Sequence, residues 1–170
     1  MKGDSTAFSP LIKLYRRQLF SYFLKLCGNK TAAEDLFQET LIKIWKAMPK
    51  YKEENKFSSW LFTIAHNTAV DYLRKFNHKN SHFVDVEIEN CGHLTNPFAE
   101  LVAAETKEII SRYIEKLPLK QREVFLLRQN CGMTFREIAE LTGEPLNTVL
   151  SHMNYALKKI RTVLRKNDEQ

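Results

Sequence analysis

The sequence predicts an all-α protein that consists of two small helical domains. Apolar residues recur at three- and four-residue spacing over long stretches, which is the period of an amphipathic helix, and no useful length of chain alternates as a β-strand does. Glycine and proline number only five each among 170 residues, so helix-breaking residues are scarce. An apolar content of 44% is typical of a globular protein.

Three helices are expected in the first half of the chain. The first is predicted over Phe8–Leu26 and ends where Gly28 or Asn29 can stop it. The second is predicted over Thr31–Met48, with Thr31 as its cap and Pro49 as its stop. A polar loop follows, and a third helix is expected over Ser58–Phe76. Together they are expected to make up one small domain of three to four helices.

The second helix has two distinct faces. Its apolar residues recur at the spacing of a buried stripe, which is Leu36, Phe37, Thr40, Leu41, Ile44, Trp45 and Met48. Outside that stripe lie Asp35, Gln38, Glu39 and Ile42, which are adjacent on the helix surface because three- and four-residue steps separate them. Acidic groups around an apolar residue, on an otherwise basic domain, suit a basic protein partner. An ordinary solvated face is the alternative.

Aromatic residues are dense in the third helix and in the loop before it. They include Tyr51, Phe57, Trp60 and Tyr72, and the cations Arg74, Lys75 and Lys79 follow. Aromatic rings beside cations suit unpaired bases, because every base has a stacking face and every linkage a phosphate. Leu61, Ile64 and Ala65 are assigned to the core. For Tyr51, Phe57 and Trp60, core and base stacking both remain open.

Residues 81–97 are predicted to be a linker, because no sustained period runs through them. Residues 84–108 contain one basic and six acidic residues. The segments on either side are basic: residues 1–83 contain 14 basic and 7 acidic residues, and residues 109–170 contain 11 basic and 7 acidic residues. Basic blocks suit a polyanion such as nucleic acid, although plain solvated surface would have the same charge.

The cysteines and histidines do not suggest a metal site or a disulfide framework. Cys27, Cys91 and Cys131 are far apart and odd in number, which fits a reducing cytosol. His82, Cys91 and His93 lack a matching second pair of ligands. No metal and no cofactor is therefore expected. The start of the chain has no secretion signal, and no apolar run is long enough to span a membrane.

The second half of the chain ends in a predicted helix-turn-helix. Helices are expected over Phe98–Glu115 and from Pro118 to about Asn130. Thr134 and Glu137 then have the spacing of a capping box, which marks a helix start. Thr142-Gly143 is the break, and Pro145 prepares the next helix. This order of elements is typical of a DNA reader.

The last helix separates a core stripe from a polar face. The stripe is Val149, Met153, Ala156, Leu157, Ile160 and Leu164. The opposite face has Asn147, Ser151, Asn154, Tyr155 and Lys158, whose side chains can bond base edges or phosphates. Lys159, Arg161, Arg165 and Lys166 extend the helix with positive charge. DNA is the favoured partner of this face, and a helical hairpin that packs on another protein is the alternative.

Three segments together resemble a known family. "AEDLFQETLIKIWKAM", "FSSWLFTIAHNTAVDYLRK" and "LPLKQREVFLLRQNCGMTFREIAELTGEPLNTVLSHMNYALKKIR" occur in this order, with an acidic linker between the second and third. They are similar to bacterial sigma factors of the sigma-70 family. The absence of a third domain between them points to the extracytoplasmic-function (ECF) group. The resemblance implies sigma domain two over residues 1–80, a flexible acidic linker over 81–97, and sigma domain four over 98–170.

The resemblance also implies a role for each surface. Asp35, Gln38, Glu39 and Ile42 match the segment that docks on the β′ clamp helices of core RNA polymerase. The segment that opens the minus-ten element corresponds to Tyr51, Phe57, Trp60, His66, Asn67, Asp71, Arg74 and Lys75. The helix-turn-helix would read the minus-thirty-five duplex through Arg136, Asn147, Thr148, Leu150, Ser151, His152, Asn154, Tyr155 and Lys158. Core polymerase, including its β flap, promoter DNA and an anti-sigma factor are the implied partners.

The sequence departs from the family pattern in the recognition helix. Many relatives have Gly at Asn147 and a cation near Leu150, His152 and Tyr155, which this chain lacks. Fewer phosphate contacts are expected from this helix, with Arg128, Arg136 and the residues from Lys158 onward taking a larger share. Leu150 could instead contact a thymine methyl. His66 replaces a residue that is often Arg, which would lower the charge beside the melted strand.

Other functions explain less of the sequence. A helix-turn-helix regulator that acts without core polymerase leaves the aromatic first domain and the Asp35 patch unexplained. A decoy that mimics a sigma factor commonly lacks these two features. No Ser/His/Asp set, phosphate loop or metal cluster indicates an enzyme. The expectation is a non-enzymatic bacterial initiation factor in the cytoplasm, held at the membrane through an anti-sigma factor in one state.

Overall fold

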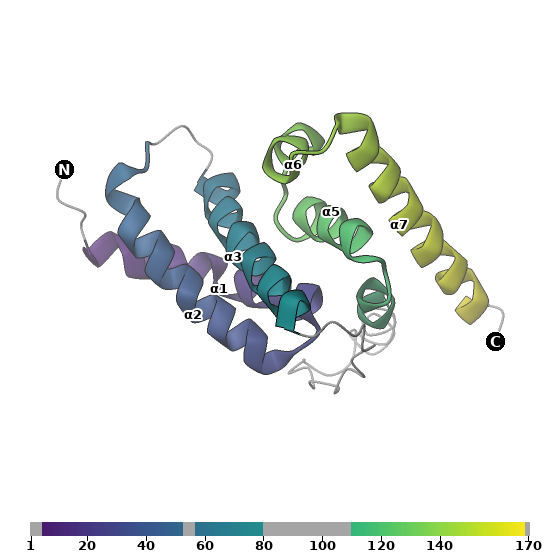
Figure 1. The fold of residues 1–170 in the computed structure, drawn as a ribbon, viewed down its shortest axis with the longest axis horizontal. Coiled ribbons are helices and arrows are strands. Elements are labelled where there is room, and N and C mark those ends of the chain that lie inside the picture. The colour runs from purple at the N-terminus through teal and green to yellow at the C-terminus, as the bar shows by residue number, and fades with distance from the viewer. Residues whose placement is uncertain (1–4, 53–56, 80–109, 169–170) are drawn as a thin grey trace.

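The computed structural model describes residues 5–52, 57–79 and 110–168 of the chain (Figure 1). The helices are α1 (Ser5–Cys27), α2 (Lys30–Ala47), the 3-10 turn η1 (Met48–Lys50), α3 (Phe57–Lys79), α5 (Leu119–Gln129), α6 (Phe135–Thr142) and α7 (Leu146–Asp168). Residues 110–115 are also helical. No strand occurs in these ranges, which agrees with the predicted all-α class. The predicted linker, with His82, Cys91 and His93, lies outside the described residues.

Helices α1, α2 and α3 form the first domain around one apolar core (Figure 1). The fully buried side chains there include Leu19, Tyr22 and Phe23 of α1, Leu36 and Ile44 of α2, and Leu61 and Phe62 of α3. Burying a side chain of this size stabilises the fold by about 1.5–3 kcal/mol. Tyr22 and Phe62 meet edge to face, with ring centroids 6.0 Å apart. Of the three core residues predicted in α3, Leu61 and Ala65 are fully buried, and Ile64 is partly buried against the same core.

The start of α2 corrects one prediction. The cap is Asn29 and not Thr31, because the Asn29 side chain accepts a hydrogen bond from the Ala32 amide at 2.9 Å. Gly28 takes a φ of 66°, which ends α1 and turns the chain at once. The cap therefore lies two residues before the predicted one, the helix begins at Lys30, and Thr31 lies exposed in its first turn.

Helices α5, α6 and α7 form the second domain, and α6 and α7 are the predicted helix-turn-helix. Thr134 caps α6 through the Glu137 amide, and the Glu137 carboxylate accepts from the Thr134 amide, so the predicted capping box is confirmed. Gly143 ends α6 in the left-handed conformation. Val149, Met153, Ala156 and Ile160 of the predicted stripe are buried, together with Ile138 of α6, whereas Leu157 is only partly buried and the side chain of Leu164 is not among those described.

Replacing Gly143 should destabilise the second domain through the backbone alone. Its φ is 69°, which costs an L-residue about 1–2 kcal/mol, and nothing lies within 4 Å of a Cβ placed there. We expect Gly143→Val to lower the free energy of unfolding by roughly that amount in urea titrations. Gly143→Asn is the control, since asparagine tolerates this conformation, and it should lose clearly less. Equal losses in both variants would contradict a backbone cause.

The two domains contact each other in this structure (Figure 1). Helix α1 lies beside α5, and Ser59 of α3 donates a hydrogen bond to Glu137 of α6. Arg122 of α5 donates to the Leu26 carbonyl at 3.0 Å, and so satisfies a backbone acceptor in the last turn of α1. It also donates to the carbonyls of Glu115 and Leu117, just before α5. Among the helices that the structure describes, none has the length and apolar character that a membrane span requires.

Candidate nucleic-acid interface

The predicted docking face of α2 is exposed. Asp35, Gln38 and Glu39 lie on the surface, and Ile42 is 56% exposed. Lys43 pairs with Glu39 at 2.7 Å, one turn away, and donates to Thr68 of α3 at 3.1 Å. The structure therefore groups these four residues on one face. An exposed isoleucine among carboxylates is a feature of a protein-binding surface.

Trp45 was predicted in the buried stripe of α2, and this is wrong, because its side chain is 48% exposed. It lies three residues after Ile42, so the two form neighbouring apolar positions on the helix surface. Large amphipathic aromatic residues are enriched at the energetic centres of protein interfaces. Trp45 therefore extends the exposed apolar surface that begins at Ile42, and its i+3 spacing from Ile42 was the sequence signal for this.

The loop and the start of α3 form an aromatic cluster of Tyr15, Tyr51, Phe57 and Trp60. Ring centroids of Tyr51 and Trp60 are 4.8 Å apart, and those of Phe57 and Trp60 are 5.5 Å apart. Tyr15 of α1, which the sequence did not single out, joins through Phe57 at 5.6 Å. All four are only partly buried. They pack on one another and remain partly exposed, so packing accounts for part of each side chain and base stacking stays a prediction.

A cavity of about 550 Å³ adjoins this cluster. Lys50, Lys52, Tyr51 and Trp60 line it from the first domain, and Glu137, with other residues of the second domain, lines the opposite side. The first-domain wall combines cations with aromatic rings, which is the combination that binds a single strand. The opposite wall adds carboxylates, which repel phosphates.

The rest of the predicted strand-opening set divides by exposure. Asn67, Arg74 and Lys75 are exposed on α3, and Asp71 is partly exposed. Asp71 and Arg74 form an ion pair one turn apart, so the Arg74 charge is partly neutralised. Lys75, the next residue along the helix, adds a second exposed cation to this face. These four lie further along α3 than the aromatic cluster.

His66 is buried, with 3% of its surface exposed. Its Nδ1 accepts from the Tyr22 hydroxyl at 3.1 Å, and its Nε2 lies 3.2 Å from Glu123 Oε1 of the second domain. Burial and, to a smaller extent, the nearby Lys120 ammonium together lower the pKa of His66 to about 4. The ring is therefore neutral near pH 7. In this arrangement His66 contacts the second domain and is closed to DNA.

The recognition face of α7 is largely exposed, as predicted. Asn147, Ser151, Asn154 and Lys158 lie on the surface, and Tyr155 is 59% exposed. Ser151 donates to the Asn147 carbonyl at 2.8 Å, which leaves its oxygen as an acceptor. The remaining members are Arg136, exposed on α6, and Thr148, Leu150 and His152, partly buried on α7.

Two residues near this face have intramolecular partners. His152 Nε2 lies 3.3 Å from Glu144 Oε2, so this ring is held at the start of α7. Arg128 donates to the Met133 carbonyl at 2.9 Å and stacks over the Phe135 ring at 5.1 Å. Its guanidinium is thus engaged within the second domain, which limits the phosphate contact expected from it. In the described ranges, no group of three His, Cys, Asp or Glu side chains is placed to hold a metal ion.

Comparisons with known proteins agree with the two-domain division of these surfaces. The sequence matches the family description "Sigma-70 region 2" over residues 11–78 and "Sigma-70, region 4" over residues 107–160. It is 29% identical to the ECF RNA polymerase sigma factor SigW of Bacillus subtilis, over 96% of this chain and 92% of that protein. It is 31% identical to the ECF RNA polymerase sigma-E factor of Escherichia coli K12, over 94% of this chain and 87% of that protein.

Two solved structures share the fold. The sigma factor RpoE from Bartonella quintana, in complex with the anti-sigma factor NepR, aligns with a TM-score of 0.75 at 23% identity, over 94% of this chain and 97% of that one. CnrH, in complex with the cytosolic domain of CnrY, aligns with a TM-score of 0.66 at 22% identity, over 96% and 91%. With both regions matched in order and more than 30% identity over nearly the whole chain, this protein belongs to the ECF group of sigma-70 family RNA polymerase sigma factors.

Proposed function

We propose that this sigma factor binds core RNA polymerase through α2, opens the minus-ten element with the aromatic cluster, and reads the minus-thirty-five duplex with α7. One observation supports this most strongly: a single chain presents an aromatic cluster beside cations on one domain and a polar, exposed helix face on the other. Neither surface alone requires a polymerase. Together they fit a factor that must read a duplex and hold a melted strand.

The α2 face supplies the contact with the polymerase. Ile42 and Trp45 are the apolar anchors, and Asp35 and Glu39 flank them with negative charge. Residues of this kind at the centre of an interface give most of the binding energy, while charges at its rim steer the partner. A basic, partly apolar helical surface on the polymerase is the complement of this face.

The aromatic cluster stabilises the open strand. Extruding a base costs a few kcal/mol of unstacking and unpairing. Stacking on an aromatic side chain returns about 1–3 kcal/mol per base. Trp60 and Tyr51 offer such a surface, and Lys50 and Lys52 lie beside it for the phosphates. Binding energy therefore drives melting, and no hydrolysis step is needed.

Different residues of the α7 face should select the base sequence and bind the phosphate backbone. Asn154 should set base preference, whereas Lys158 should contact phosphate. We expect Asn154→Ala to relax preference at one or two positions of a randomised minus-thirty-five duplex, at about 1–3 kcal/mol per lost base contact. Lys158→Ala should weaken all sequences alike and reduce the salt slope by about 1. Binding selections read by sequencing, at two salt concentrations, distinguish the two. The roles would be rejected if Lys158→Ala changed the preferred sequence.

Run-off transcription tests the whole assignment against a regulator that acts without core polymerase. Purified core polymerase, a promoter library and this chain should give specific starts that neither protein gives alone. Tight duplex binding without such starts would favour the regulator. We also propose an anti-sigma factor as a partner on the cytoplasmic side, because one aligned structure is a sigma factor in complex with an anti-sigma factor.

A further inference from the structure

A cavity between the two domains has the size and the aromatic lining of a small-molecule site. Its volume of about 550 Å³ lies within the roughly 300–1,000 Å³ that is usual for ligand pockets. Tyr51 and Trp60 line it, and their ring centroids are 4.8 Å apart. Both side chains are only partly buried. This Tyr51–Trp60 cavity therefore offers a face on which a nucleobase can stack.

Two lysines lie on the same wall of the cavity as the rings. Lys50 and Lys52 flank Tyr51 in the sequence, line the cavity and are exposed. Neither forms an ion pair with another residue that the structure describes. A lysine ammonium binds phosphate as a point charge. Two of them beside one ring suit a ligand that has more than one phosphate.

The opposite wall, which α6 supplies, has the contrary charge. Glu137 and Glu140 line it, three residues apart and so on one face of the helix. The Glu137 carboxylate is already engaged, because it accepts from Ser59 at 2.9 Å and from the Thr134 amide at 2.8 Å. Glu140 is exposed and forms no bond with another described residue. It is therefore the carboxylate that is available to accept hydrogen bonds from a ligand.

The Tyr51 hydroxyl is a further unsatisfied group at this site. It is buried, yet it has no hydrogen-bond partner among the residues that the structure describes. Buried polar groups in folded proteins almost always have a partner, because an unmade hydrogen bond costs stability. A polar ligand in the adjoining cavity would supply the missing partner.

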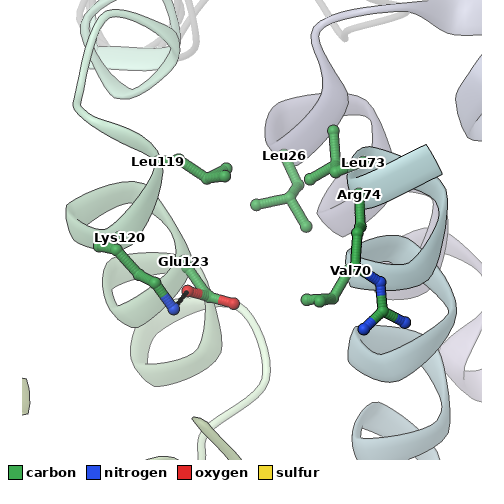
Figure 2. A pocket seen from close by; sticks show the side chains of 7 residues that line it. All are labelled: Leu26, Val70, Leu73, Arg74, Leu119, Lys120 and Glu123. Atoms are coloured by element: carbon green, nitrogen blue, oxygen red, sulfur yellow. Dashed lines mark ion pairs between the residues drawn. The ribbon is translucent and has the colours of Figure 1, made fainter. Parts of the chain in front are cut away.

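A groove elsewhere between the domains lacks this combination. It has a volume of about 380 Å³ and lies between α5 on one side and α1 and α3 on the other (Figure 2). Its charged side chains are already paired, Lys120 with Glu123 at 3.3 Å and Arg74 with Asp71. None of the described residues that line it is aromatic. A stacking surface beside unpaired charges therefore distinguishes the Tyr51–Trp60 cavity from this groove.

The charges of the two walls suit a single nucleotide better than a strand. A strand that ran through the cavity would bring successive phosphates toward Glu140, and like charges oppose binding. A free nucleotide has its phosphates at one end and the hydrogen-bond donors of its base at the other. When its base stacks on Trp60, its phosphates can meet Lys50 and Lys52. The donors on its base can reach the α6 wall, where Glu140 accepts hydrogen bonds.

We propose that the Tyr51–Trp60 cavity binds a guanine nucleotide with two or more phosphates. Guanine places two N–H groups side by side on its pairing edge, and one carboxylate can accept from both. This site goes beyond the proposed function, because it needs neither polymerase nor promoter. A bound nucleotide covers the ring surface of Trp60 and so competes with an unpaired strand. That consequence alone rests on the proposed function.

Isothermal titration calorimetry of the full-length chain with GDP tests the site. GDP should bind at least about tenfold more tightly than inorganic pyrophosphate, which cannot stack, or guanosine, which has no phosphate. Trp60→Ala should weaken GDP binding at least about tenfold, and so should Lys50→Ala combined with Lys52→Ala. Lys30→Ala is the matched control, because it removes an exposed lysine at the start of α2, outside the cavity. It should bind GDP as the wild type does.

Inosine diphosphate tests the role of Glu140, because inosine lacks only the 2-amino group of guanosine. The wild-type chain should prefer GDP to inosine diphosphate by about tenfold, since a hydrogen bond to a charged group is lost. Glu140→Ala should bind the two nucleotides equally. Glu140 is exposed and alanine favours helix, so this variant should keep its fold. An equal preference in the wild-type chain would overturn the guanine assignment.

Intrinsic fluorescence locates the bound nucleotide. The chain has two tryptophans, so Trp45→Phe leaves Trp60 as the only one, and GDP should quench its emission. Absence of binding at about 1 mM GDP would overturn the proposal. Equal affinity for GDP and pyrophosphate would also overturn it, because only the lysines would then bind. Unchanged GDP binding in Trp60→Ala would overturn it too, since the ligand would lie elsewhere. Loss of GDP binding in that variant with normal promoter opening would support the nucleotide site and reject the strand-opening role.

Discussion

Reversing the charge of Asp35 and Glu39 to lysine is expected to weaken binding to core RNA polymerase about a hundredfold. Both carboxylates are exposed on α2 and flank the apolar pair Ile42 and Trp45. Placing two cations there opposes a basic partner surface, and like charges across an interface cost several kcal/mol. The change also leaves Lys43 without its partner Glu39, a surface pair worth little to folding.

Fluorescence titration of labelled chain with core polymerase measures this loss directly. Thermal unfolding should be unchanged, because neither residue belongs to the core. Glu140→Lys is the charge-matched control for each single reversal, since it changes an exposed carboxylate on α6 outside the docking face. If the double variant bound core polymerase with wild-type affinity, the proposal that α2 is the docking face would be wrong.

Trp60→Ala should slow promoter opening by roughly one to two orders of magnitude, because stacking on an aromatic ring contributes about 1–3 kcal/mol per base. The indole contacts the rings of Tyr51 and Phe57 and keeps part of its surface exposed. Truncation therefore removes a stacking surface and loosens its two neighbours. Open-complex formation, followed by permanganate reactivity of unpaired thymines, should fall at saturating polymerase.

A template already melted at the minus-ten element separates opening from binding. Transcription from it should be largely restored in Trp60→Ala, since the unpairing cost has been removed. Trp45→Ala is the matched tryptophan control: it should weaken binding to core polymerase and open normally once bound. Failure of the pre-melted template to rescue Trp60→Ala would refute the strand-opening role.

Helical periodicity predicted the elements well and the edges of their faces poorly. The apolar stripe of α2 consists of two parallel rows of side chains, which start at Leu36 and Phe37. The row that contains Leu36 and Ile44 is fully buried. The other row ends at Trp45, whose side chain is 48% exposed. Spacing along one helix does not report where its neighbour stops. The cap at Asn29 was missed for a similar reason, because it depends on the conformation of Gly28.

His66 could have been predicted to be buried, though its partner could not. It shares helical spacing with Phe62 and Ala69, both fully buried, so it belongs to the apolar face of α3. The carboxylate that meets it, Glu123, lies 57 residues later in another domain. No local pattern connects the two. The charge of Arg128 was likewise assigned to DNA because its bond to the Met133 carbonyl depends on the turn after α5.

The division of α7 into a buried stripe and an exposed face has a consequence for how this factor can evolve. Val149, Met153 and Ala156 hold the helix in the domain, while Asn154 and Tyr155 project into solvent. Substitutions at exposed positions usually change stability by less than about 0.5 kcal/mol. A lineage can therefore exchange residues of the exposed face, and acquire a new set of target promoters, without losing the folded domain during the change.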